Sequence, residues 1–222
     1  MAGRILAIGG GCAGSPLEDF LLELAGKARP RVCFLPTPAS HDPAYIEVFY
    51  DAFRNRHCDP SHVQLFGVPE SPLERIASAD VVYVSGGNTA NALAIWRVHG
   101  VDRALREVWQ RDGVLGGWSA GGICWFEDAM TDSFGPQLRP LGDGLGFLMG
   151  SFCPHFDGEP LRRPTYLQAV HDGTLPPGLA ADDDAALLFE GTQLREVVSQ
   201  REGAGAYRVT ADGEEPLETR AL

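Results

Sequence analysis

Short apolar runs alternate with amphipathic stretches along the first 126 residues of the chain. The apolar runs are typical of strands buried on both faces of a parallel sheet, and they lie at 4–8, 31–35, 63–66, 80–85 and 114–118. Between them, helical spacing recurs at 43–56, 72–78, 90–98 and 102–111, and Pro16 opens a further helix. This alternation predicts an α/β fold, in which helices flank a mostly parallel, doubly wound sheet.

The pattern changes after residue 126. Residues 127–165 are rich in Gly, Pro and Asp, and a single helix is expected at 165–172. The last part of the chain predicts short strands at 185–189, 193–199 and 206–209, which we interpret as antiparallel additions at one edge of the sheet. Because no linker or repeat interrupts the chain, we expect one domain over residues 1–222.

A serine lies at the turn that follows the apolar run at 114–118. The sequence Gly-Trp-Ser-Ala-Gly at 117–121 fits the G-x-S-x-G pattern, in which a sharp strand-to-helix turn exposes the serine hydroxyl. The start of the following helix leaves free N–H groups beside Ser119 that can bind an oxyanion. From the pattern alone, a nucleophile and a plain glycine-rich turn are both open interpretations.

Two other glycine-rich turns follow apolar runs. Residues 9–14 match G-x-G-x-x-G, but the next run ends in Pro-Thr-Pro and not in the acid that a dinucleotide site needs, so we favour a simple turn. The second turn, Gly-Gly-Asn-Thr at 86–89, is expected near the serine. The N–H groups of Gly87 and Ala120 would form an oxyanion hole, while Asn88 or Thr89 would cap the next helix.

A serine nucleophile needs a histidine base and an orienting carboxylate. Of the six histidines, His155 is favoured because it follows Pro154 at the end of a short apolar run. The carboxylate candidates are Glu127, Asp128, Asp132, Asp157 and the acidic run at 182–184, which we expect to be a solvated loop. The residues themselves do not choose between Asp132 and Asp157.

Composition limits which binding partners and which cellular compartment we expect for the protein. The net charge of −12 argues against nucleic acid and anionic membranes as partners. No apolar run is long enough for a membrane span, and the first residues read as a strand and not as a signal peptide. The five cysteines include no C-x-x-C pair, which favours free thiols and a cytoplasmic location, with no metal site.

Taken together, the serine turn, the turn at 86–89 and Cys-Pro-His-Phe-Asp-Gly-Glu at 153–159 resemble the peptidase E family. These α-aspartyl dipeptidases are related to cyanophycinase and have a class I glutamine amidotransferase-like fold. The resemblance implies that Ser119 is the nucleophile, His155 the base and Asp132 the third member of a triad. It also places Gly87 and Ala120 in the oxyanion hole.

The resemblance further implies a dipeptidase that prefers an N-terminal Asp, needs no cofactor and forms a homodimer or a higher homo-oligomer. Family members bind that Asp with an arginine after the histidine, and Arg163 or Arg162 would take this role here, with Asn88 as a second contact. A carboxypeptidase-like or broader short-peptide specificity is an alternative. The remaining alternatives are an esterase, and a non-catalytic binding protein that holds a nucleotide at 9–14.

Overall fold

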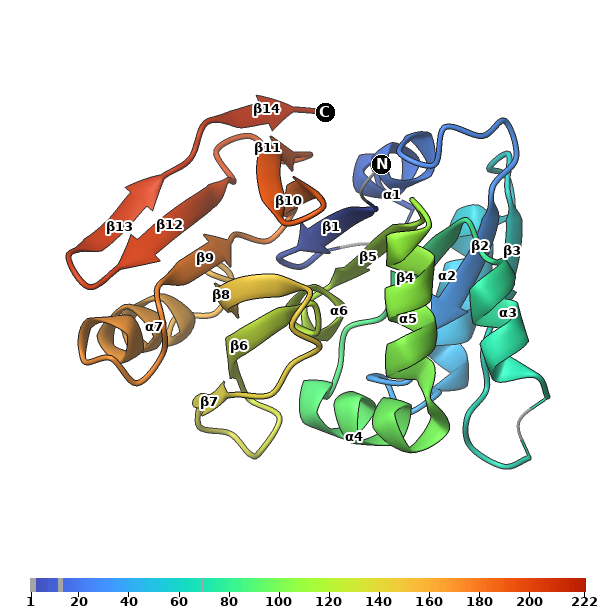
Figure 1. The fold of residues 1–222 in the computed structure, drawn as a ribbon. Helices are drawn as coiled ribbons and strands as arrows, with labels where there is room; N and C mark the ends of the chain where they lie inside the picture. Colours follow the sequence, from blue (N-terminus) through green and yellow to red (C-terminus); the bar gives the residue numbers. More distant parts are fainter. Residues whose placement is uncertain (1–2, 12–13, 69) are drawn as a thin grey trace.

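The computed structural model describes residues 3–11, 14–68 and 70–222, in two sheets that lie side by side (Figure 1). The larger sheet has the strand order β14-β11-β10-β1-β5-β4-β2-β3. Its parallel part consists of β1 (Arg4–Ile8), β2 (Arg31–Leu35), β3 (Asp59–His62), β4 (Val81–Val84) and β5 (Val114–Trp118). Its other edge consists of β10 (Ala185–Glu190), which is antiparallel to both β1 and β11 (Gln193–Ser199), and of β14 (Thr219–Ala221), which is parallel to β11.

Helices cover both faces of this sheet because successive side chains of each strand point to opposite faces. From β1, Leu6 and Ile8 pack with the helices α1 (Pro16–Glu23) and α2 (Pro43–Phe53). Ile5 and Ala7 point the other way, into the core beneath α3 (Pro72–Ser78), α4 (Thr89–His99) and α5 (Val101–Gln110). The predicted doubly wound α/β class is therefore confirmed.

The smaller sheet was not expected from the sequence. Its strands, in spatial order, are β13 (Gly213–Pro216), β12 (Ala206–Thr210), β9 (Gly178–Ala181), β8 (Leu148–Cys153), β6 (Phe126–Thr131) and β7 (Arg139–Leu141), and α7 (Arg162–His171) packs on it (Figure 1). The strands between 126 and 153 are short and carry mixed polar and apolar residues, so their pattern resembles that of a loop. Only pairing with distant segments makes them a sheet.

Two local expectations were wrong. The strand expected at 63–66 lies at Asp59–His62, because an edge strand needs only main-chain pairing with β2 and carries no apolar signature. The strand expected at 206–209 forms as β12, but it pairs with β9 and β13 of the smaller sheet and not at the edge of the larger one. The helix predicted after Ser119 is α6 (Ala120–Ile123), which is short since the chain then enters β6. Among the described residues, no helix combines the length and apolar character that crossing a bilayer requires.

Candidate active site

The turn between β5 and α6 has the geometry that the G-x-S-x-G pattern predicts. Ser119 has φ 54° and ψ −113°, a conformation that a non-glycine residue adopts only when its surroundings enforce it. A side chain at Gly121 would clash with the carbonyl oxygen of Val84, so glycine is required for α6 to approach β4 this closely. The Ser119 amide donates to the Ile8 carbonyl at 3.1 Å, which ties the turn to the end of β1.

The start of α6 supplies an amide beside the serine. The Ser119 carbonyl accepts from the N–H groups of Gly122 and Ile123, each at 2.9 Å. Ala120 is the first residue of the helix, where an N–H group has no intrahelical acceptor. Its amide is therefore positioned as the sequence predicted for an oxyanion donor, although its role stays a prediction.

His155 lies just beyond β8 and pairs with an acid from the run at 182–184. Its Nδ1 lies 2.6 Å from Oδ1 of Asp183, and both side chains are partly exposed. An ionised carboxylate can only accept hydrogen bonds, so the proton of a neutral imidazole is on Nδ1, and Nε2 is free to take another. The backbone of His155 has φ 53°, a second strained position at this end of the sheet.

Gly10, two residues after the end of β1 in the larger sheet, contacts both Asp183 and His155. It forms a bridge with Asp183, and its carbonyl accepts from the Asp184 amide at 2.9 Å. A Cβ atom there would clash with Oδ1 of Asp183 and would stand 2.5 Å from Cε1 of His155. A glycine at position 10 thus leaves the space that the Asp183 carboxylate and the His155 imidazole occupy. Cys12 and Ala13 of the same turn lie outside the described residues.

Ser119 and His155 consequently both lie near the carboxyl end of β1. Ser119 is bonded to Ile8, the last residue of β1, and His155 lies against Gly10, two residues further along the chain. The carboxyl ends of parallel strands are the edge at which α/β proteins gather reactive groups. The arrangement places a hydroxyl, an imidazole and a carboxylate at this end of the strands.

A network of ion pairs and hydrogen bonds holds the acidic run at 182–184 in place. Arg201 bonds to both the Asp157 carboxylate and the Asp183 carbonyl, and the Asp183 amide donates to Asp157 at 2.9 Å. Burial alone would raise the pKa of Asp157, but the hydrogen bonds from the Asp183 amide and the Arg201 guanidinium outweigh this and lower it. Asp157, the alternative triad acid, therefore supports Asp183 and does not bond to His155 itself.

The acid that bonds to His155 is thus Asp183 and not Asp132. The Asp132 side chain is 57% exposed and lies 3.5 Å from Arg162. Its neighbour Ser133 accepts from the amides of Thr89 and Ala90 at the start of α4. Hydrogen bonding around 131–133 therefore stabilises a helix terminus, which explains the polar residues on either side of Asp132. Glu127, the other alternative acid, accepts instead from an amide of β8.

The turn at 86–89 lies beside the serine. A Cβ atom at Gly86 would stand 3.5 Å from Cβ of Ser119. The amide of Gly87, the next residue, therefore lies at the same end of the parallel strands as Ser119. Asn88 caps α4 by accepting from the Asn91 amide at 2.9 Å, as predicted, and it also donates to the Ser133 carbonyl. Since its amide group is engaged at both ends, the geometry does not support Asn88 as a substrate contact.

The two arginines after His155 are engaged within the protein. Arg163 forms an ion pair with Glu214 and stacks over the rings of Phe156 and Tyr207. Arg162 is 2% exposed and bonds to Glu159 and the Met130 carbonyl. Both guanidiniums are thus already paired with acids of the protein itself.

Asp183 is the site residue that sequence reasoning placed in a solvated loop. Asp182 next to it is 2% exposed, and burial raises its pKa. One signal was present in the sequence: three acids stand directly before a fully apolar strand, while Gly9 and Gly10 follow another. Glycines beside a strand end indicate that another segment approaches closely, and here that segment carries the acid.

Comparisons with known proteins agree on a peptidase. The model of the family described as "Peptidase family S51" matches residues 5–197. The "Uncharacterized peptidase YgaJ" of Bacillus subtilis (strain 168) is 48% identical over 212 residues, which cover 93% of this chain and 91% of that protein. "Peptidase E" of Shewanella denitrificans is 30% identical over 143 residues, 60% of each chain. The crystal structure of a peptidase from an acI-B1 Actinobacterium superposes with a TM-score of 0.74 at 19% identity, covering 99% of this chain and 95% of the other, and shows the shared fold.

Proposed function

Because the chain belongs to peptidase family S51, a family of serine-type peptidases, we propose that it hydrolyses short peptides through an acyl-enzyme on Ser119. The observation that carries the proposal is the hydrogen bond of 2.6 Å between His155 and Asp183 at the strand end next to Ser119. A histidine held by an acid beside a strained serine turn is the arrangement that activates a hydroxyl for attack.

The proposed reaction has two steps. Nε2 of His155 takes the proton of Ser119 while the hydroxyl oxygen attacks the scissile carbonyl, and the amides of Gly87 and Ala120 hold the oxyanion. His155 then protonates the leaving amine, which breaks the peptide bond and leaves the acyl group on Ser119. A water, deprotonated by the same Nε2, then attacks the acyl carbon. The bond to the Ser119 oxygen breaks, that oxygen takes the proton from Nε2, and the acid product leaves. Asp183 holds the Nδ1–H tautomer and stabilises the imidazolium that forms in each step.

An N-terminal Asp is the substrate residue that the family resemblance implies. Its carboxylate would need a cation, and both Arg162 and Arg163 are occupied by acids of the protein itself. We therefore propose hydrolysis of short peptides and do not assign the Asp preference to this chain. A set of dipeptides with and without N-terminal Asp tests this choice.

The nucleophile is tested by Ser119→Ala. This variant is expected to lose at least about 10⁴-fold in kcat on the best dipeptide while keeping the circular dichroism of the wild type. A fluorophosphonate, which reacts with activated serines, should add its mass to the peptide that contains Ser119 in the wild type only. Turnover retained by the variant, or labelling of another residue, would refute the assignment.

A further inference from the structure

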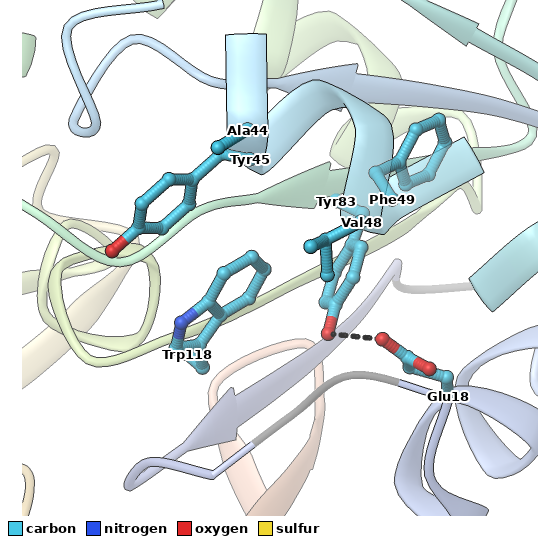
Figure 2. Close-up of a pocket in the computed structure, with 7 residues that line it drawn as sticks. All are labelled: Glu18, Ala44, Tyr45, Val48, Phe49, Tyr83 and Trp118. Atoms are coloured by element: carbon cyan, nitrogen blue, oxygen red, sulfur yellow. Dashed lines mark hydrogen bonds between the residues drawn. The ribbon is translucent and has the colours of Figure 1, made fainter. Parts of the chain in front are cut away.

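An apolar cavity of about 300 Å³ opens beside the serine turn. It lies between α1, α2 and the ends of β4 and β5, and its walls include Tyr45, Val48 and Phe49 of α2, with Tyr83 and Trp118 of the sheet (Figure 2). An apolar cavity of about 150 Å³ already holds benzene, so this one has room for a phenyl or an indole group.

Trp118 connects the cavity to the serine. It is the last residue of β5 and directly precedes Ser119 in the turn. A Cβ atom at Gly86 would stand 2.8 Å from Nε1 of Trp118 and 3.5 Å from Cβ of Ser119, so the indole, the turn at 86–89 and the serine are immediate neighbours. A side chain in the cavity therefore belongs to a residue close to the bond that Ser119 attacks.

The walls of the cavity are held in place by ring contacts. Trp118 stacks on Phe34 with ring centroids 6.1 Å apart and touches Tyr83 at 5.1 Å. Phe34 in turn stacks on Phe49 at 4.5 Å. These rings belong to one buried cluster, so the cavity is preformed and loses little entropy when an apolar group enters it.

The charge of the cavity disfavours acidic side chains. Among the described residues that line it, Glu18 is the only carboxylic acid. Its carboxylate accepts from the Ser15 amide at 3.1 Å. It also accepts from the Tyr83 hydroxyl at 3.2 Å (Figure 2). Burial raises the pKa of Glu18 despite those hydrogen bonds and Arg56 behind it. Over the described residues, no lysine or arginine lines the cavity, so a substrate carboxylate would find no cation there.

We propose that this cavity selects an apolar side chain, aromatic or branched aliphatic, on one of the two residues that flank the scissile bond. The inference rests on the proposed peptidase function of Ser119 and names the substrate class of that same site. An apolar group in the cavity displaces water from the rings around it, whereas Asp would leave its charge unpaired near Glu18.

The test is a panel of dipeptides in which Phe, Leu, Ala, Gly, Asp or Lys occupies either position beside Ala. We expect kcat/KM for Phe and Leu to exceed that for Gly and Asp by at least about tenfold at one of the two positions. Equal rates across the panel, or a preference for Asp, would overturn the inference.

Two variants connect the preference to the cavity. Val48→Trp, at a half-exposed position of α2, fills the cavity and should lower kcat/KM for Phe by about tenfold while leaving that for Gly within about twofold. Val98→Trp makes the same change at an exposed position of α4 outside the cavity and should alter neither value. Equal effects of the two variants would also refute the role of the cavity.

The outcomes separate the two proposals. If the protein cleaves dipeptides with Ser119 but shows no apolar preference, only the inference about the cavity fails. If it cleaves none of the panel, or if Ser119→Ala cleaves as fast as the wild type, the proposed function fails and the inference fails with it.

Discussion

At the scale of single residues, the site depends on which acid faces His155. Asp132 and Asp183 are both aspartates in polar surroundings, and their side chains differ in what they touch. Asp183 bonds to the imidazole at 2.6 Å and is held by Asp157 and Arg201, whereas Asp132 is largely exposed. A hydrogen bond at this distance sets the tautomer of His155, which an acid elsewhere on the surface does not affect.

Asp183→Asn should therefore abolish most of the activity. An amide keeps the shape of the side chain but can hold His155 in the wrong tautomer, so kcat should fall by about three to four orders of magnitude. Asp132→Asn is the matched control and should stay within a few fold of the wild type. Steady-state kinetics on one dipeptide decides the assignment, and a larger loss for Asp132→Asn would return the role to that residue.

At the scale of elements, the ends of the parallel strands are joined by charged side chains. Asp80, just before β4, accepts from the backbone and guanidinium of Arg31 at the start of β2, and from Lys27 at 2.8 Å. Its side chain is only 9% exposed. Burial alone would raise the pKa of Asp80, but these hydrogen bonds outweigh it and hold that pKa well below its usual value.

Asp80→Asn is expected to lower the free energy of unfolding by about 2 kcal/mol at neutral pH. Because the folded-state pKa of Asp80 is depressed, its stabilisation is complete above the unfolded-state pKa and is lost as the pH falls through the folded-state pKa. The difference between wild type and variant should thus stay constant from pH 7 to about pH 5 and shrink progressively below that in urea titrations.

Asp59→Asn is the control for this prediction. Asp59 pairs with Arg29 at the neighbouring edge strand, but both side chains are more than half exposed, so its loss should cost less than about 1 kcal/mol. Equal losses for Asp80→Asn and Asp59→Asn would show that the ion pairs around Asp80 do not stabilise the sheet.

At the scale of the whole molecule, the two sheets share one hydrophobic core. Phe126 and Phe152 of the smaller sheet stack with centroids 4.9 Å apart, and Phe126 also meets Phe189 of the larger sheet edge to face at 5.9 Å. One cluster of buried residues includes all three, together with Ile5 of the central strand. We therefore propose that residues 1–222 unfold as one cooperative domain.

Phe152→Ala is expected to lower the free energy of unfolding by about 3–5 kcal/mol, because it opens a cavity where the sheets meet. Met149→Ala on the same strand removes an exposed side chain and should change it by less than about 0.5 kcal/mol. Near-ultraviolet circular dichroism and loss of activity should report a single transition for both variants. Separate transitions would contradict the shared core.

Much of the protein can be predicted from local sequence patterns. Apolar runs and helical spacing predict the doubly wound sheet, and the pattern at 117–121 predicts the strained turn at Ser119. His155 stands out because a proline and an apolar strand precede it. These features depend on residues that are neighbours in the chain, so backbone sterics and side-chain periodicity are enough to reveal them.

The partner of His155 and the neighbourhood of the serine are decided by the tertiary structure. Asp183 reaches His155 across 28 residues because β10 pairs antiparallel with β1, which brings the segment before β10 to Gly10. The cavity beside Trp118 likewise combines α1, α2 and two strands. Runs of acids are common in solvated surface loops. Only the packing of distant strands therefore distinguishes the acid that contacts His155 from acids that are exposed to solvent.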